Sequence, residues 1–365
     1  MAAIQKRTRN GKTSYRVRYR DPSHTQRSKS FDRRVDAERF ARTVEVEKDA
    51  GTWIDPKAGR TTLAEWRTRF VATELGNRAS TRARDESYWR NHMGPILGPR
   101  PLASIDYATV QGWVGDLSAR VSPATVAKAY GILSKTLNGA VKAGLIPANR
   151  AEGVELPRIE REEQQFLTVG EIDRLADAID PQYRMLVLVG AYGGLRRGEL
   201  FALRRSRVDL MARHVNVVET AIEVSGHHSF GPPKSRAGHR RVPLPRRVID
   251  ELIPDLVRLD PDDLLWTSSE GHPLRSNFRS RVWLPAIRRA GLENLRMHDL
   301  RHTAVSLWIA AGANPKETAT WAGHSSVSTI LDIYGHLLPG SEEPVMDALD
   351  RMQSSPAGAV IELRR

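Results

Sequence analysis

The sequence predicts a mainly α-helical protein with small β-sheets, an α+β fold built from successive blocks along the chain. Alternating basic and apolar residues near the N-terminus indicate a small sheet. Apolar stripes with helical spacing and capping residues indicate helices over most of the remainder. Two β-prone stretches interrupt the helices of the second half. We therefore expect an N-terminal three-stranded sheet with one helix, then a helical bundle, then a mixed α/β domain.

Residues 1–57 are predicted to form the sheet and its helix. Tyr15, Val17 and Tyr19 alternate with arginines, so one face of a strand is apolar and the other basic. From Asp36 to Ala50 the apolar residues take helical spacing. The alternative interpretation is a solvated basic arm, but the regular alternation with tyrosines favours a folded module.

Residues 58–155 are predicted to form the helical bundle. The expected helices cover about residues 62–73, 80–92, 106–119 and 123–143. The last has the clearest pattern, because Ser122 is placed to cap an apolar stripe and Gly144 follows its end. Residues 147–165 carry prolines and a charged cluster without periodicity, which predicts a linker.

Residues 166–350 are predicted to form the mixed α/β domain, followed by a C-terminal tail, residues 351–365. Thr168 and Glu171 have the spacing of a capping box at its start. The expected elements are strands at 214–224 and 239–244 joined by a Gly/Pro-rich connection, helices at about 276–290 and 298–312, and shorter helices from Asn314 and Ser326.

Basic residues exceed acidic ones, and the excess is concentrated at the N-terminus. The formal net charge is +13 and the pI about 10.2. Residues 1–34 hold 11 Lys and Arg against 2 Asp, a balance of +9. This charge favours a polyanionic partner such as nucleic acid.

The composition also excludes several classes of protein. The chain has no cysteine, which rules out disulfides, thiolate nucleophiles and cysteine-based zinc sites and fits a reducing compartment. No apolar run approaches the ~20 residues of a membrane span. The basic N-terminus lacks the apolar stretch of a signal peptide. We therefore expect a cytoplasmic protein that does not act at a membrane.

The second half of the chain holds a set of side chains that together can act on a phosphate. They are Arg196 in Gly-Leu-Arg-Arg-Gly-Glu-Leu, Lys234 in Pro-Pro-Lys-Ser-Arg, His298 and Arg301 in His-Asp-Leu-Arg-His, His324 in Ala-Gly-His-Ser-Ser, and Tyr334 in Asp-Ile-Tyr-Gly-His. The cations and imidazoles can neutralise a phosphate and move its protons, and a phenol can attack it. No P-loop and no carboxylate cluster with metal-ligand spacing competes with this set.

The spacing of His298 and Arg301 is the sharpest local signal. Three residues apart on a helix, their Cβ atoms lie about 5–6 Å from each other, so both can reach one phosphate. Glu199, three residues after Arg196, is placed to hold it by an ion pair. A second imidazole at His302 means that a count of histidines alone does not identify a site.

Each of these residues also has an ordinary structural interpretation. Arg196 fits a surface arginine in a turn before a helix, and Lys234 fits an exposed side chain on a hairpin. Tyr334 fits a core aromatic at the end of an amphipathic helix, which is the commoner role of such a residue. The order and spacing of the whole set, rather than any one member, favour a common site.

The order and spacing resemble those of the tyrosine recombinase (phage integrase) family over about residues 166–340. All six catalytic positions of the family are filled, with His324 as the usual histidine where some members have tryptophan. The upstream blocks match the family in layout rather than in motif. The resemblance implies an arm-type DNA-binding domain at 1–57, a helical core-binding domain at 58–155 and a catalytic domain at 166–350.

The resemblance implies a site-specific DNA recombinase, the integrase of a phage or mobile element, that needs no metal, ATP or other cofactor. Tyr334 would attack the DNA and form a 3′-phosphotyrosyl bond, with His298 as general base. Lys234 would protonate the departing 5′-hydroxyl. The non-bridging oxygens would be bound by Arg196, Arg301 and His324.

The implied partners are double-stranded DNA attachment sites of core and arm type, bound by four protomers, with a directionality factor or a DNA-bending protein. The apolar end of the tail, Val360, Ile361 and Leu363, is suited to docking on a neighbouring protomer. A type IB topoisomerase shares the catalytic set but acts alone, and the arm-like N-terminal module favours a recombinase. A non-catalytic DNA-binding relative fits the charge equally well, but no catalytic member is missing here.

Overall fold

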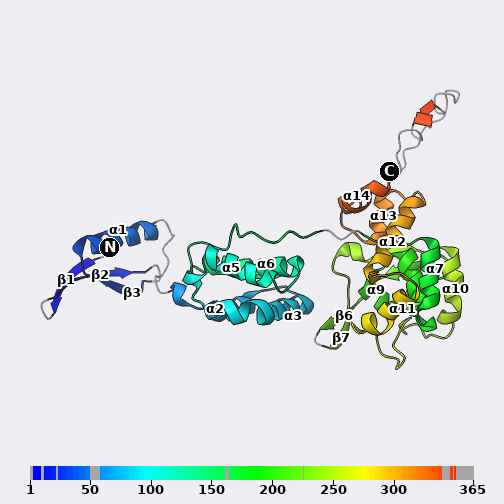
Figure 1. The fold of residues 1–365 in the computed structure, drawn as a ribbon, viewed down its shortest axis with the longest axis horizontal. Coiled ribbons are helices and arrows are strands. Elements are labelled where there is room, and N and C mark those ends of the chain that lie inside the picture. The colour runs from blue at the N-terminus through cyan, green and yellow to red at the C-terminus, as the bar shows by residue number, and fades with distance from the viewer. Residues whose placement is uncertain are drawn as a thin grey trace. The chain divides into compact units, whose positions relative to one another are not determined.

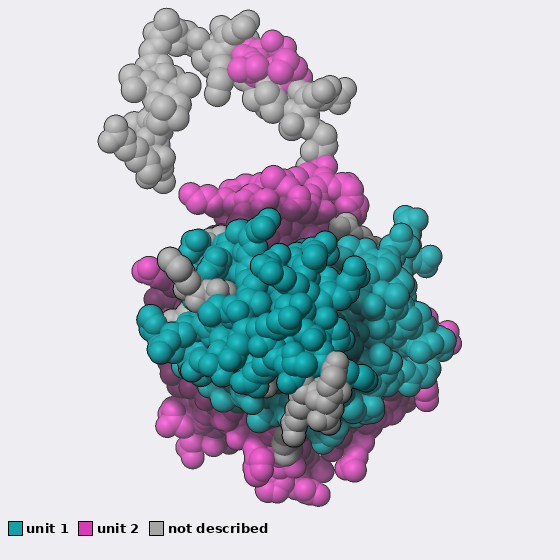
Figure 2. Space-filling view, turned by 90° about the vertical axis from the view of Figure 1, so that its left-hand side faces the viewer, with its two compact units in different colours: residues 1–161 teal, residues 162–365 magenta. Residues whose placement is uncertain are grey.

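The structure is a computed structural model that describes residues 3–9, 12–21, 24–49, 58–160, 164–224, 226–338, 346–347 and 349–350. The chain divides into two compact units, residues 1–161 and 162–365, which are coloured separately in Figure 2. The division falls inside the segment 147–165 that was predicted to be a linker. The predicted tail, including its apolar end, lies outside the described residues.

The N-terminal module is an antiparallel sheet of β1 (Ala3–Arg9), β2 (Lys12–Arg20) and β3 (Gln26–Phe31), with α1 (Arg34–Asp49) packed beside it (Figure 1). Val17 and Tyr19 of β2 are buried against Ala37 and Val44 of α1. The alternation read from the sequence therefore places the apolar face toward the helix and the arginines outward. The predicted sheet with one helix is confirmed, although the expected helix end at Ala50 lies outside the described residues.

The helical bundle of the first unit has its own apolar core. Its helices are α2 (Leu63–Thr73), α3 (Ala79–Tyr88), α4 (Gly94–Leu97), α5 (Tyr107–Ser118) and α6 (Pro123–Lys142). A π-helical turn, Trp89–Met93, joins α3 to α4, so the helix expected to end near residue 92 continues to Leu97. Trp66 of α2 donates a hydrogen bond from Nε1 to the carbonyl of Thr136 on α6, at 2.8 Å. This bond ties the first helix to the last across the core.

The second unit is built around one helix, α8 (Arg184–Gly193), which is buried along most of its length. Its helices are α7 (Val169–Ala178), α8 (Arg184–Gly193), α9 (Arg197–Phe201), α10 (Arg246–Leu256), α11 (Leu284–Arg289), α12 (Met297–Ala310), α13 (Pro315–Ala322) and α14 (Ser328–Tyr334). Every residue from Met185 to Ala191 of α8 is buried. A Cβ added to Gly190 would lie 2.8 Å from Leu300 Cδ1, so this glycine lets α8 and α12 approach closely. The candidate residue Arg196 follows α8, and the candidate residues His298 and Arg301 lie on α12.

The second unit has more strands than predicted. The stretch expected as a single strand at 214–224 is two strands, β5 (His214–Val217) and β6 (Thr220–Val224). A three-stranded antiparallel sheet has the order β4 (Val208–Asp209), β5, β8 (Arg240–Pro243), whereas β6 pairs with β7 (His227–Gly231) in a separate hairpin. The β7 strand was not predicted, because His-His-Ser-Phe-Gly lacks the alternation of a half-buried strand.

Short helical turns complete the fold. Single 3₁₀ turns occur at Ala58–Arg60, Leu102–Ser104, Pro181–Tyr183, Arg205–Arg207, Arg236–Gly238 and Gly335–Leu337, and a π-helical turn, Arg279–Trp283, leads into α11. Among the described residues, no helix combines the length and the apolar character needed to cross a lipid bilayer.

Candidate active site

Arg196 lies in the turn between the buried helix α8 and α9. Gly194 ends α8 with a φ of 59°, the left-handed conformation that glycine adopts without strain. The Arg196 guanidinium donates from Nη1 to Glu199 Oε1 at 2.9 Å and from Nη2 to the Gly323 carbonyl at 3.1 Å. The predicted ion pair with Glu199 is therefore confirmed. The Arg196 side chain keeps 40% of its surface exposed and can still contact a ligand.

Glu199 is a buried carboxylate shared by two arginines. Its side chain is 3% exposed, and that of Arg240 is 2% exposed. Arg240 binds it with two hydrogen bonds, from Nη2 to Oε2 at 2.8 Å and from Nη1 to Oε1 at 3.1 Å. Burial raises the pKa of Glu199, but Arg240 and Arg196 outweigh it, so the pKa lies below its ordinary value. Glu199 is therefore ionised and fixes Arg196 in place.

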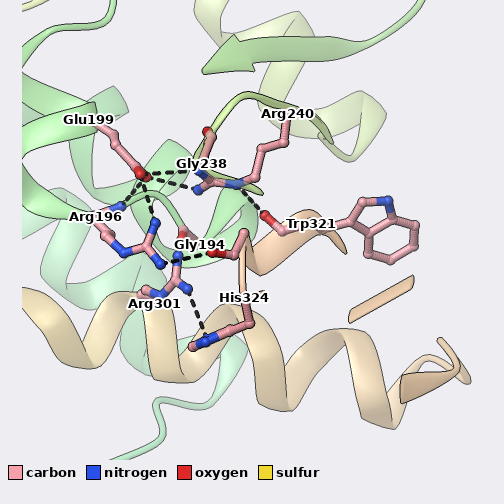
Figure 3. A network of polar contacts seen from close by, with 9 residues as sticks. Gly194, Arg196, Glu199, Gly238, Arg240, Arg301, Trp321 and His324 are labelled. Atoms are coloured by element: carbon pink, nitrogen blue, oxygen red, sulfur yellow. Dashed lines mark hydrogen bonds and ion pairs between the residues drawn. The ribbon is translucent and has the colours of Figure 1, made fainter. Parts of the chain in front are cut away.

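Arg240 connects three segments that carry candidate residues (Figure 3). Besides Glu199, it donates to the Gly238 carbonyl at 3.1 Å and to the Trp321 carbonyl at 2.6 Å. Gly238 belongs to the connection that contains Lys234, and Trp321 lies on the helix before His324. Arg240 was not predicted from the sequence. The available signal was its position two residues before Val242 on β8, because residues two apart on a strand share a face and Val242 lies on the buried one.

Arg301 lies on α12 and is 2% exposed. It donates from Nη1 to the Gly194 carbonyl at 2.9 Å, and its Nη2 lies 3.0 Å from His324 Nε2 (Figure 3). Burial lowers the pKa of Arg301 to about 9, and the positive charges of Arg196 and Arg240 add to this effect. The guanidinium remains charged at neutral pH, in surroundings that favour an added anion.

His324 follows the tight turn that ends α13. Gly323 has a φ of 69°, and a Cβ there would lie 3.0 Å from both the Ala237 carbonyl oxygen and Arg240 Cδ. The turn thus depends on glycine for conformation and for space. Burial and the charge of Arg301 lower the pKa of His324 to about 4. The imidazole is therefore neutral at pH 7, and its Nε2 accepts the hydrogen bond from Arg301.

Tyr334, at the end of α14, lies against α12 and outside this network. It is 1% exposed, and its Oη lies 2.6 Å from Nδ1 of His302. Burial raises the pKa of Tyr334 to about 12, although the charge of Arg301 opposes the shift. Among the described residues, Tyr334 makes no hydrogen bond to Arg196 or His324.

The two histidines of α12 occupy different positions. His298 is solvent-accessible on the first turn, and the partial desolvation of its ring together with Arg301 lowers its pKa. Its ring meets that of His302 edge-on, with centroids 4.8 Å apart. The hydrogen bond of Tyr334 is to His302, which was not among the residues predicted from the sequence, so the role of His298 as general base stays a prediction.

Lys234 is the candidate residue that stands apart from the others. Its side chain is exposed in the connection after β7 and has no hydrogen bond or ion pair with another residue that the structure describes. The connection is anchored next to it, because Pro233 is buried against Gly238, where an added Cβ would lie 2.4 Å from the Pro233 Cβ. Lys234 is therefore close in sequence to the Arg240 network and free to turn toward a ligand.

Comparison with known proteins identifies relatives of this chain. Residues 165–340 match the model of the phage integrase family. The chain is 27% identical to the integrase of Mycobacterium phage D29 over 312 residues, 82% of this chain and 83% of the relative. It is 26% identical over 336 residues to a putative prophage phiRv2 integrase of Mycobacterium tuberculosis, 89% of this chain and 88% of the relative.

Two solved structures share the fold. The Tn1549 transposon integrase, in complex with a circular intermediate DNA, matches with a TM-score of 0.67 and 17% identity, over 80% of this chain and 99% of that one. A lambda integrase tetramer bound to a Holliday junction matches with a TM-score of 0.55 and 19% identity, over 89% and 93%. These likenesses confirm the α+β fold predicted from the sequence.

The Arg240 contacts predict a large difference between two neighbouring arginines. Arg240→Ala removes the main partner of a buried carboxylate and is expected to lower the free energy of unfolding by about 3–5 kcal/mol. Arg241 is exposed on the other face of β8, so Arg241→Ala is expected to change it by less than about 0.5 kcal/mol. Urea denaturation of both variants measures the difference. Equal losses would show that Arg240 does not hold the site together.

The neutral histidines predict that mild acid destabilises the protein. The pKa of His302 and that of His324 are about 4 when folded and 6.5 ordinarily, so each ring gains a proton on unfolding between these values. The free energy of unfolding is thus highest above pH ~6.5 and falls toward pH ~4. One proton per ring sets an upper limit of about 1.4 kcal/mol per pH unit for each ring, and solvent screening of these half-buried groups makes the slope smaller.

Urea denaturation at several pH values between 6.5 and 5, above the ordinary carboxyl pKa range, measures this slope. His324→Gln is expected to reduce it, because the amide does not titrate. The same slope in the variant and the parent protein would mean that His324 is not held neutral in the fold.

Proposed function

We propose that this chain is a tyrosine recombinase of the phage integrase family, which breaks and rejoins DNA at specific sites. In this proposal Arg196, Arg301 and His324 bind the scissile phosphate. The supporting observation is the convergence of these side chains from three segments, with Arg301 bonded to His324 and Arg196 bonded to the turn that carries His324. Such a cluster of preorganised donors is what a phosphoryl-transfer site needs.

The local charge supports phosphate as the ligand. The network of Figure 3 holds three guanidinium groups, those of Arg196, Arg240 and Arg301, and one carboxylate, that of Glu199, which leaves two positive charges. A phosphodiester would offset part of this excess. Each charge-assisted hydrogen bond contributes about 1.5–3 kcal/mol, so several that strengthen as charge grows on the phosphate lower the barrier appreciably.

Tyr334 is the proposed nucleophile and Lys234 the proposed acid. The phenol oxygen forms a bond to phosphorus, which yields a 3′-phosphotyrosyl intermediate and releases a 5′-hydroxyl. Lys234, on its open connection, protonates the departing oxygen. Tyr334 lies beside α12, where its hydroxyl contacts His302, the residue after Arg301. A movement of α14 or of the DNA therefore brings Tyr334 to the phosphate. Energy retained in the intermediate drives religation without ATP.

We also assign roles to the three blocks of the chain. Residues 58–155 and 166–350 bind the core attachment site as a helical core-binding domain and a catalytic domain. Residues 1–57 bind arm sites through the outward face of the sheet. We propose that four protomers act together on two duplexes, with a directionality factor or a DNA-bending protein as further partners, and that the tail 351–365 contacts a neighbouring protomer.

The nucleophile is tested with a nicked suicide substrate. After cleavage, this substrate loses the short fragment between the cleavage site and the nick, so the strand cannot be rejoined. The parent protein is expected to accumulate a covalent adduct, visible after denaturing electrophoresis, without added metal or nucleotide. Tyr334→Phe is expected to form none while its affinity for core DNA stays within about threefold, because only the reacting oxygen is removed. Adducts that persist in the variant would overturn the assignment of Tyr334.

Recombination is distinguished from topoisomerase activity with two substrates. Two attachment fragments are expected to yield joined products. Efficient relaxation of supercoiled plasmid without an attachment site, and no joined products, would instead identify an enzyme of the type IB topoisomerase kind.

The arm-binding proposal makes a prediction about two faces of the N-terminal module. Arg18 and Arg20 are exposed on the sheet, whereas Arg39 and Arg42 are exposed on α1. The double variant Arg18→Ala/Arg20→Ala is expected to weaken binding to DNA flanking the core and to leave core binding unchanged. The slope of the logarithm of the binding constant against the logarithm of the salt concentration is expected to fall in magnitude by about 0.9 for each phosphate that the variant no longer neutralises. The control Arg39→Ala/Arg42→Ala removes the same charge from the other face. Equal effects of the two variants on binding isotherms would refute a specific sheet–DNA interaction.

A further inference from the structure

Lys234, the proposed acid, lies on a short loop whose two ends are in contact. A Cβ added to Gly238 would lie only 2.4 Å from the Cβ of Pro233, so the loop from Pro233 to Gly238 closes on itself. We propose that Pro233 and Gly238 are positioning residues for Lys234, because their contact holds the loop closed and keeps the ammonium within reach of the departing 5′ oxygen. The proposal rests on the function proposed above, in which Lys234 protonates that oxygen.

Burial and a hydrogen bond fix the closed form of the loop. Pro233 and Gly238 are both buried, whereas Lys234 between them is exposed. The amide of Gly238 donates to the Ser235 carbonyl at 2.9 Å, within the 3₁₀ turn Arg236–Gly238. The ends of the loop are therefore anchored in the protein, and the lysine side chain remains accessible to a ligand.

The end of the loop is tied to the proposed phosphate site. Arg240 donates a hydrogen bond to the Gly238 carbonyl at 3.1 Å. At Gly323, in the turn before His324, an added Cβ would lie 3.0 Å from the Ala237 carbonyl oxygen. The backbone of the loop thus packs directly on the turn that carries one of the proposed phosphate ligands.

The chain enters the loop from a strand that is also fixed near this site. Gly231, the last residue of β7, pairs with Thr220 of β6. A Cβ added to Gly198 of α9 would lie 2.5 Å from Thr220 Oγ1, so β6 packs closely on the helix that begins directly after Arg196. Both ends of the connection are therefore held, and the contact within the loop decides the path of the chain between them.

The position of the lysine backbone matters because its side chain is long and flexible. As the P–O5′ bond breaks, the ammonium gives one proton to the departing oxygen and becomes a neutral amine, and in religation the 5′-hydroxyl returns the proton. A misplacement of about 1 Å can slow such a step about 100-fold. A loop closed before DNA binds limits the positions that the ammonium can take, so less ordering remains for the bound state.

The test uses two suicide substrates that differ in one atom, the bridging oxygen or sulfur at the scissile 5′ position. A thiol has a pKa of about 8.5, so a sulfur leaving group departs without a proton donor. Single-turnover adduct formation is compared for the parent protein, Lys234→Ala and Gly238→Ala. In Gly238→Ala the new Cβ meets Pro233 and forces the loop open.

Gly238→Ala is expected to form adducts at least about tenfold more slowly with oxygen, and within about threefold of the parent rate with sulfur, because an acid contributes about 10²–10⁴-fold and only the oxygen needs one. Lys234→Ala is expected to show the same dependence. The control Gly231→Ala is expected to keep the parent rate on both substrates, since its Cβ would lie at an ordinary 3.5 Å from Ile222 Cδ1. Slow adduct formation by Gly238→Ala on both substrates, or parent rates on both, would overturn the proposal.

A pair of double variants tests the contact itself. With Pro233→Gly the nearest atom of residue 233 to the new alanine Cβ is its Cα, at 3.7 Å, so Pro233→Gly/Gly238→Ala is expected to cleave the oxygen substrate at least about threefold faster than Gly238→Ala. Pro233→Ala/Gly238→Ala keeps the colliding Cβ and is expected to stay slow. Equal rates of the two double variants would contradict the proposed contact.

Failure of the loop proposal is distinguishable from failure of the proposed function. If Gly238→Ala does not unfold cooperatively in urea, Pro233→Gly replaces it, with the same expected dependence on the leaving group. Absence of adducts from the parent protein, or equally slow cleavage of both substrates by Lys234→Ala, would contradict the function proposed for this chain or for Lys234.

Discussion

The active site depends on one buried carboxylate, that of Glu199, held between two guanidinium groups. Burying an ion costs several kcal/mol unless partners replace its water, and here Arg240 and Arg196 supply them. The same contact orients Arg196, whose exposed edge remains available for a ligand. Arg240, which stabilises the fold, and Arg196, which is proposed to bind the phosphate, thus share one counter-ion, so the integrity of the site is coupled to that of the domain.

The arrangement leaves positive charge that the protein itself does not neutralise. Arg301 is buried, yet its partners are a backbone carbonyl and a neutral imidazole rather than a carboxylate. Such a group is costly to keep desolvated, and its lowered pKa reflects that cost. A structural arginine would be expected to have a carboxylate, as Arg240 does. The unbalanced charge is therefore best understood as a preorganised anion site.

The proposed nucleophile, Tyr334, lies next to this candidate anion site and outside its hydrogen-bond network. Tyr334 is bonded to His302 and packed on α12, while Lys234 is exposed on the connection that also carries Gly238, a partner of Arg240. If these residues act as proposed, their separation means that the bound DNA has to bring the phenol, the acid and the phosphate ligands together. Burial also keeps the phenol protonated, which limits its reactivity before substrate binds.

The sequence by itself determined what depends on near neighbours. The helices with capping boxes, the apolar face of β2 and the Arg196–Glu199 pair were predictable, because their partners lie within a few residues or alternate along one strand. Only the tertiary structure decided that Arg240 holds Glu199 across 41 residues and that Tyr334 meets His302 across 32. Local spacing makes His298 and His302 similar candidates to contact Tyr334, and the packing of α14 on α12 brings His302 into that contact. The strand β7 was missed for a related reason, since its pairing with β6 compensates for a weak strand pattern.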